Sequence, residues 1–440
     1  MVDPMTLHTA IMIVALLSGF IAMARFRQSQ ALVMPLIAIT FLVLDGRGAD
    51  ATLRNCFAGF APIAVVFTAI AICAHQIQRS GAFQVVGSLL GSLIGHIGLR
   101  RPKYIVMMVT ALVLLLTSTI AALFHNITAI MVMTPIAIAI CVSYKLPSRW
   151  LLCGALVASN LGGFSTAWGD TPNILEARVW DLSHGDFAGE ILPVNLLILA
   201  LLVIAVAALM GRDAHRAEAL LSPIQIAERG TDFGTLATEV EIDRRLLSVG
   251  LAGLIGFILV QGINRDWEIA AGAAAILFAV ASDRPQHRLE ALHSLGLDVY
   301  LILLSVFVIA HTLGKSMLGS QLHNIISVTG GATWAVAVSS YVGTMLTEAA
   351  SWAAAAAPIT HRIKSAHSAA WALGGGICAG SSSLLTAASA GVILWTESRR
   401  FPGHEVEFQT YLPFGLGASL LMLGAYIIIL TTLETLGWII

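Results

Sequence analysis

Residues 160–173, which read NLGGFSTAWGDTPN, decide the fold. They lie inside a hydrophobic segment that begins near Trp150, yet they include two adjacent glycines, three hydroxyl side chains, an aspartate and a proline. Glycine and proline at this density interrupt helical hydrogen bonding. An interrupted backbone at membrane depth is tolerated only where protein or a water-filled cavity satisfies the freed polar groups. The stretch therefore predicts an unwound, polar break in a membrane-spanning helix.

The composition of the whole chain agrees with a membrane protein. Of its 440 residues, 57% are hydrophobic and 11% are charged, against roughly 25% charged residues in soluble domains. The net charge of -1 gives no basic excess that would indicate nucleic-acid binding. The five cysteines lie in apolar segments without Cys-x-x-Cys spacing, which predicts no zinc or redox site. The absence of a Walker A sequence argues against an ATP-driven pump.

Apolar windows of roughly 20 residues predict an all-α polytopic membrane protein with about 10 to 11 spans. The predicted divisions are N-terminal scaffold spans in 1–55, a first repeat in 56–210, a hydrophilic linker in 211–245, scaffold spans in 246–297 and a second repeat in 298–440. Within the first repeat, residues 76–97 favour an amphipathic helix at the membrane interface. The apolar arms 104–122 and 127–143 then form either two spans or one re-entrant hairpin.

The second half repeats the order of the first. Ala74-His75 ends one predicted span and Ala310-His311 ends another, and each is followed by an amphipathic piece, the second at 315–328. Pro135 and Pro358 occupy corresponding places in the paired arms, and 162–166 corresponds to about 380–383. These matches predict an internal repeat.

Positive charge predicts how the repeats are oriented. If six loops share one side, they hold 17 of the 24 Lys and Arg, which makes that side cytoplasmic. These loops are 25–29, 76–103, 144–149, 211–245, 283–297 and 397–410. The two amphipathic pieces then fall on opposite sides, so the repeats are inverted, as in many secondary transporters.

Two predicted half-helices begin near the first break. Asn126 is expected to cap the helix that returns from the arm turn, and Thr171 is expected to cap the helix that starts at Pro172. Their N-termini offer N–H donors that suit an anion, while unwound carbonyls at 162–165 offer acceptors that suit a cation.

Asp170 is the most informative single residue. A carboxylate at the centre of a span costs about 2.5–3.5 kcal/mol on insertion scales. Its structural interpretation is a helix cap, and its functional interpretation is a carboxylate that exchanges a proton for a cation; the two are compatible. Glu348, at the second arm turn, is either the counterpart acid or a solvated loop glutamate. His125 is either a proton relay or an interfacial histidine.

The pair FHNITAIMVMTP and SNLGGFSTAWGDTPN resembles the ArsB/NhaD branch of the ion transporter superfamily. That resemblance implies inverted repeats, each with a re-entrant hairpin and an unwound span, which move as an elevator-like transport domain against a scaffold. It covers roughly residues 56–433 and is more specific in the first half. The patterns NLGG, IDRRLL at 242–247 and AGS at 379–381 are similar to a magnetosome branch of the family.

The candidate ion- and proton-binding residues combine these two lines of argument. They are Asp170, Asn126, Thr128, Asn160, Gly162, Gly163, Ser165, Thr166, Glu348, Ser382, Ser383, Thr386 and Ser389, with His125 as a proton relay. Serines also pack membrane helices tightly, so any single one of them is more often a packing residue than a ligand. Many relatives carry glycine and asparagine in the second break, and this chain does not, so the resemblance does not extend to cation selectivity there.

The sequence thus predicts a secondary active transporter that exchanges protons for a cation, most simply sodium, with Asp170 as the titrating carboxylate. An anion carrier of the arsenite or dicarboxylate type is the alternative. The chain lacks the second intramembrane aspartate that an aspartyl protease would need, and it lacks the facing histidine that a serine mechanism would need. A structural scaffold would not need broken helices. We expect an inner membrane or a specialised membrane derived from it, a cytoplasmic linker at 211–245, no cofactor, no transition metal and a homodimer.

Overall fold

The computed structural model describes residues 4–25, 30–100, 104–216, 242–263, 268–283, 300–301, 304–305, 308–309, 311–312, 324, 327–347 and 349–439. All regular elements in these ranges are helical. Glu348 lies outside the described residues, as do 217–241 of the predicted linker and most of the predicted amphipathic piece at 315–328.

The first repeat contains a helical hairpin followed by a broken helix. The hairpin is α5 (Ile105–Phe124) and α6 (Asn126–Ser143), and the broken helix is α7 (Ser148–Gly163) and α8 (Thr171–Trp180). A short helix, α9 (His184–Asp186), and a π-helical segment, η3 (Phe187–Ile191), lead into the long α10 (Leu192–Arg216).

The second repeat has the same hairpin, broken helix and long final helix in the same order. Its hairpin is α17 (Thr333–Thr347) and α18 (Ala349–Ile363), its broken helix is α19 (His367–Ser381) and α20 (Ser389–Ser398), and α21 (Phe408–Thr435) corresponds to α10. The two breaks, 164–170 and 382–388, have the same length and the same succession of turns and bends. The predicted repeat is therefore present in the fold.

The short second half of each broken helix packs against the hairpin of the other repeat. In the first repeat α8 packs against α18 of the second, and α20 of the second packs against α6 of the first. α7 and α19 also meet directly, as do α10 and α21. Such reciprocal contacts are what a two-fold relation between the halves produces, and a single apolar core runs through both.

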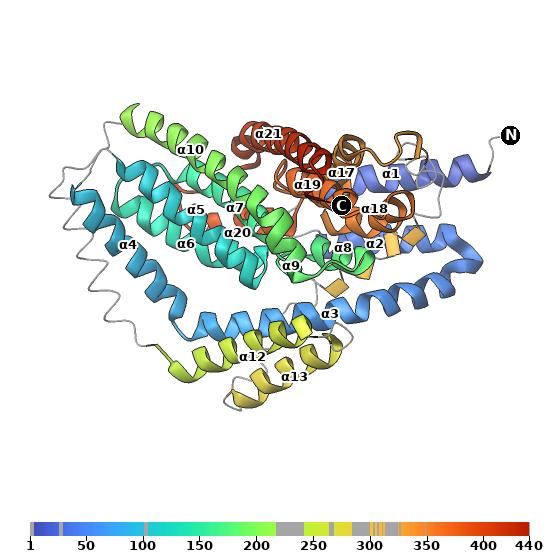
Figure 1. The fold of residues 1–440 in the computed structure, drawn as a ribbon, viewed down its shortest axis with the longest axis horizontal. Coiled ribbons are helices and arrows are strands. Elements are labelled where there is room, and N and C mark those ends of the chain that lie inside the picture. The colour runs from blue at the N-terminus through green and yellow to red at the C-terminus, as the bar shows by residue number, and fades with distance from the viewer. Residues whose placement is uncertain are drawn as a thin grey trace.

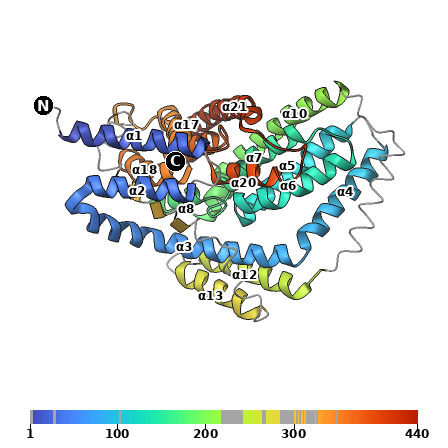
Figure 2. The ribbon, with the colours of Figure 1, turned by 180° about the vertical axis from the view of Figure 1, so that it is seen from behind.

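A separate group of helices flanks the repeats. The long α3 (Ala49–Arg79) packs against α12 (Arg244–Ile263) and α13 (Glu268–Ser282), and the three lie along one side of the molecule in both views (Figure 1, Figure 2). α1 (Pro4–Arg25) and α2 (Gln30–Asp45) pack together at one end. Arg79 fastens this group through an ion pair with the buried Asp283 at 2.7 Å.

The structure corrects the predicted start of the amphipathic helix. α3 continues to Arg79, and α4 (Ala82–Arg100) begins after a 63° bend rather than at residue 76. The bend falls at Gly81, whose φ of 83° favours glycine over any other residue.

Four described helices are long and apolar enough to cross a membrane, or five if the bent pair is counted. They are Ile105–Phe124, Asn126–Ser143, His184–Ala214 and Phe408–Thr435, with Ala71–Arg79 and Ala82–Ile97 as the bent pair. The helices on either side of each break are individually too short for this criterion, because the break divides them. The total of about 10 to 11 spans stays a prediction.

Candidate functional site

The two half-helices at the first break begin differently from the sequence prediction. Asp170 is the N-cap of α8, and its Oδ1 accepts a hydrogen bond from the Thr171 backbone N–H at 2.8 Å. His125 is the N-cap of α6, and its ring nitrogen accepts from the Ile127 N–H at 3.4 Å. The predictions that Thr171 and Asn126 are the caps are therefore wrong by one residue each, whereas the structural interpretation of Asp170 as a helix cap is confirmed. His125 adopts a φ of 81° at the hairpin tip, a feature that sequence patterns do not reveal.

The hairpin tip meets the broken helix directly. The Asn126 backbone N–H donates to the Gly169 carbonyl at 3.1 Å, and the Asn126 side-chain amide donates to Asp170 Oδ2 at 2.9 Å. His125 Nε2 lies 3.9 Å from Asp170 Oδ1. Both carboxylate oxygens of Asp170 thus accept hydrogen bonds, and the positive end of α8 adds to their stabilisation. This is the environment of an ionised carboxylate.

A chain of polar side chains connects this tip to the second repeat. Asn126 donates to Asn160 Oδ1 at 3.4 Å, and Asn160 donates to the Ser382 hydroxyl at 3.0 Å. Ser382 begins the second break, and its carbonyl accepts from Tyr411 at 2.6 Å. Among the candidate residues, the structure therefore brings Asp170, Asn126, Asn160 and Ser382 together.

Other candidate residues of the first break hold its backbone in place. Thr166 donates to the Ala122 carbonyl of α5 at 2.8 Å, and Ser165 donates to the Leu161 carbonyl at 2.7 Å. At Gly162 an added Cβ would fall within 2.7 Å of the Ser118 backbone carbonyl carbon, so this glycine permits close contact between α7 and α5. In the structure these residues hydrogen-bond to or pack against the neighbouring backbone, and their contacts with an ion stay a prediction.

Asn173 was not among the candidate residues, although it closes the quoted stretch. Its side-chain amide donates to the Gly163 and Thr166 carbonyls, both at 2.7 Å. It thereby satisfies two carbonyls that the break frees from helical bonding. The signal in the sequence was an asparagine within the first turn after Asp170-Thr-Pro, placed to reach back to the interrupted backbone.

The second break copies the geometry of the first without its charge. The Ala349 N–H donates to the Ala387 carbonyl at 3.2 Å, as Asn126 does to Gly169. Ala388 caps α20 with φ −145° and ψ 149°, close to the −149° and 153° of Asp170, but it has no capping side chain.

The remaining candidates lie at or near these two tips. Ser383 is buried and donates to the Gly380 carbonyl at 2.6 Å. Ser389 and Thr386 are half-buried at the start of α20 and in the second break, and Thr128 is half-buried in the first turn of α6. The Thr386 hydroxyl oxygen is buried without a hydrogen-bond partner among the described residues.

Glu176 is a second residue that the sequence argument missed. It lies on α8, six residues after Asp170, and its side chain is fully buried. Neither carboxyl oxygen has a hydrogen-bond partner in the described part of the chain. A Cβ added to Gly374 of α19 would lie 2.5 Å from Glu176 Oε2, so the carboxyl faces the second repeat.

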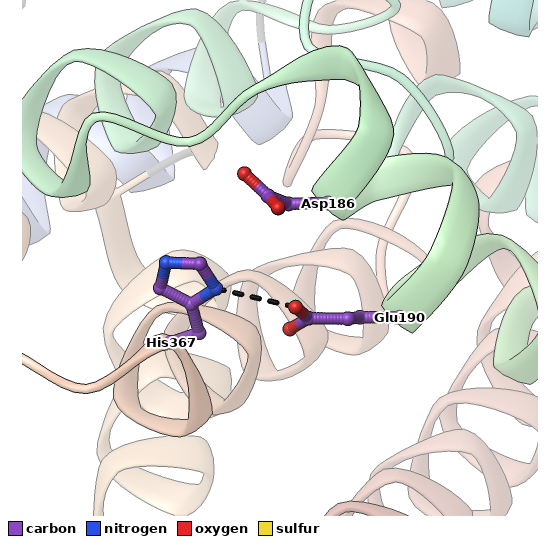
Figure 3. Close-up of side chains that lie close together, drawn as sticks. All are labelled: Asp186, Glu190 and His367. Atoms are coloured by element: carbon purple, nitrogen blue, oxygen red, sulfur yellow. Dashed lines mark hydrogen bonds and ion pairs between the residues drawn. The ribbon is translucent and has the colours of Figure 1, made fainter. Parts of the chain in front are cut away.

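A polar cluster of Asp186, Glu190 and His367 also joins the two repeats (Figure 3). Glu190 of η3 accepts from the Trp371 indole at 2.6 Å and lies 3.3 Å from His367 Nδ1, both on α19. Asp186 accepts from the Ser183 backbone N–H at 2.6 Å in a capping box. One ligand atom from each member lies within 4.8 Å of the others. Hydrogen bonds within the protein account for both carboxylates, so we interpret the cluster as a fastening between the repeats.

A comparison with protein families assigns the chain. The citrate transporter family, CitMHS, matches residues 4–391, which include both hairpins and both breaks. The chain belongs to the citrate transporter family. Membership in this family makes the chain an integral membrane transporter of a small substrate, and the ArsB/NhaD branch stays a prediction.

Two individual relatives of this family member are magnetosome proteins. The magnetosome protein MamN of Magnetospirillum gryphiswaldense is 28% identical over 378 residues, which cover 81% of this chain and 80% of that protein. MamN of Paramagnetospirillum magneticum is 28% identical over 192 residues, and this match spans only 40% of that relative. The similarity to a magnetosome branch is therefore supported by sequence.

A solved structure shares the fold. The YdaH transporter of Alcanivorax borkumensis aligns with a TM-score of 0.54 over 89% of each chain, at 16% sequence identity. At this identity the similarity shows the architecture alone. The family and the fold together establish a secondary transporter built from two repeats with broken helices.

Proposed function

We propose that this transporter exchanges protons for a monovalent cation, most simply sodium, and that Asp170 binds the cation. The observation that carries the proposal is the environment of Asp170 at the meeting point of the hairpin tip and the break. Two donors and a helix N-terminus hold its carboxylate ionised, and its side chain keeps 16% of its surface exposed. An ionised carboxylate that is both ordered and accessible is a suitable ligand for a cation.

A second oxygen atom close to Asp170 and the absence of Lys and Arg from the surrounding segments support a cation over an anion as the substrate. Asn126 Oδ1 is buried and has no hydrogen-bond partner among the described residues, so its lone pairs are available to a cation. Residues 124–143, 160–176 and 374–396, which form the hairpin tip and both breaks, contain no Lys or Arg. An anionic substrate would therefore meet a carboxylate without a cationic side chain from these segments.

Transport also requires the site to face each side in turn. In the proposed cycle, the hairpins and broken helices move as one body against the group α3, α12 and α13. The reciprocal packing of α8 on α18 and of α20 on α6 supports movement of the two repeats as one body. This is the elevator-type movement that the resemblance to the ArsB/NhaD branch implies.

The experiment is a flux measurement in proteoliposomes that contain a pH-sensitive dye. Sodium, lithium and potassium gradients are applied in turn to the wild-type protein and to Asp170→Asn, which keeps the size of the side chain and removes its charge. We expect cation-driven proton movement in the wild type and its loss in the variant. Unchanged exchange in Asp170→Asn would refute the proposal.

A second candidate is a carrier of citrate or another carboxylate anion. The name of the family favours it, and so do the N-termini of α6, α8, α18 and α20, which converge pairwise at the two breaks. In this case Asp170 binds a coupling cation and the helix N-termini bind the anion. Citrate and arsenite gradients applied to the same vesicles separate the candidates, because a response to anions alone excludes cation exchange.

A further inference from the structure

Glu176 of α8 is a buried acidic group that the proposed exchange leaves without a role. Its side chain is 0% exposed, whereas the side chain of Asp170, on the same half-helix, is 16% exposed. The space that the Glu176 carboxyl occupies exists only because Gly374 on α19 has no side chain. Glu176 therefore lies in the contact between the first repeat and the second.

The surroundings of Glu176 suit a neutral carboxyl group. Both of its oxygens lack a hydrogen-bond partner among the described residues. A buried ionised carboxylate without a partner is strongly disfavoured, and such a group becomes neutral by taking up a proton. In this conformation Glu176 consequently holds a proton.

The titratable groups around Glu176 include no described cation at contact distance. Asp170 lies about 9 Å away along the helix axis, at 1.5 Å per residue, and its negative charge disfavours ionisation of Glu176. From α19, Cys378 is the nearby titratable group, and Gly374 lies next to both the Glu176 carboxyl and the Phe164 ring of the first break. From α18, His361 packs edge-to-face against Trp180, one turn beyond Glu176, with ring centroids 5.3 Å apart.

Asp170 and Glu176 therefore form a pair of carboxyls with opposite environments. Hydrogen-bond donors hold the first as an anion, and burial without donors holds the second as a neutral acid. Where two nearby carboxyls are separated in this way, the environments assign one as the ionised group and the other as the proton donor.

We propose that Glu176 carries the exchanged proton while Asp170 binds the cation. This inference rests on the proposed cation/proton exchange. A cation on Asp170 cancels the negative charge that disfavours ionisation of Glu176. Once the transport movement lets water reach the carboxyl, the O–H bond of Glu176 breaks, its electron pair stays on the carboxylate and its proton leaves to that water. One monovalent cation enters for each proton released, so the charge of the site is unchanged.

The proton is located by difference infrared spectroscopy of the purified protein in nanodiscs. The C=O stretch of a protonated carboxylic acid is recorded before and after sodium is added. We expect sodium to remove this band in the wild type and the band to be absent in Glu176→Gln. In Asp170→Asn the band should persist with or without sodium. A band that persists in Glu176→Gln and disappears in Asp170→Asn would place the proton on Asp170 and overturn the inference.

Sodium binding measured by calorimetry across pH gives an independent result. Wild-type affinity should rise by up to tenfold per pH unit, the limit for one proton released per cation. Glu176→Gln should bind sodium with less than a twofold change per unit, and its vesicles should exchange isotopic sodium without moving protons. Retained pH dependence and proton flux in this variant would overturn the inference.

Two further variants guard against a folding artefact. Glu407→Gln removes an exposed carboxyl that pairs with Arg399 and should behave as the wild type. Gly374→Ala keeps the Glu176 carboxyl but places a methyl group against it, so it should shift the infrared band.

If wild-type vesicles show no cation-driven proton flux, the exchange itself fails. The infrared band then still reports whether Glu176 is protonated, so the two failures are distinguishable.

Discussion

The role of Asn173 in holding the first break gives a quantitative prediction. Asn173→Ala removes two hydrogen bonds of 2.7 Å, one to the Gly163 carbonyl and one to the Thr166 carbonyl. A buried acceptor that loses its donor costs about 1–3 kcal/mol, so the two carbonyls together account for about 2–6 kcal/mol. Thr166 is half-buried, which lets water replace part of the loss. We therefore expect the free energy of unfolding to fall by about 2–4 kcal/mol.

The assay is unfolding in mixed micelles as the fraction of sodium dodecyl sulfate rises, followed by tryptophan fluorescence. Asn55→Ala is the matched control because Asn55 is exposed on α3. Substitutions of this kind typically stay within about 0.5 kcal/mol of the wild type. If Asn173→Ala unfolds within that margin, the two carbonyls do not depend on Asn173 and the argument for the break is refuted.

Two further predictions test close packing and buried charge. Gly162→Ala forces a methyl group against the Ser118 backbone of α5, and we expect a loss of about 3 kcal/mol; Gly424→Ala, with open space around it, should be neutral or slightly stabilising in the same unfolding assay. Arg79→Ala removes the ion pair of the buried Asp283, which keeps its hydrogen bond from Gln76, and should cost about 3 kcal/mol. The double variant with Asp283→Ala should recover most of this loss, and a strictly additive result would contradict the pairing.

Much of the fold could be predicted because breaks in membrane helices require unusual residues. The glycines, hydroxyls and proline of residues 160–173 located the first break, and the corresponding places of Pro135 and Pro358 in the paired arms supported the internal repeat. The details of capping could not be predicted in the same way. The start of α6 depends on the left-handed backbone of His125, which forms because the tip bonds to Gly169, far along the chain.

The site was predictable only in part, for a related reason. Asp170 and Asn126 are conspicuous in apolar surroundings, and the structure joins them at 2.9 Å. The sequence does not show whether the side chain of a single glutamate such as Glu176 is buried or extends far enough for its carboxyl to reach water at a helix end. Its burial follows from a gap in another repeat, at Gly374, which no local pattern encodes.

The two breaks share their backbone geometry but differ in the chemistry of the residue that caps the following helix. The caps of α8 and α20 have nearly the same dihedral angles, and both hairpin tips bond to the break in the same way. At the cap, however, the first break has Asp170 where the second has Ala388. The shared geometry therefore explains how two half-helices can meet within a membrane, but it cannot explain ion selectivity. Under the proposed cation exchange, the charge that binds the cation therefore belongs to the first break, and Ser382 of the second break accepts a hydrogen bond from Asn160 across the interface between the repeats.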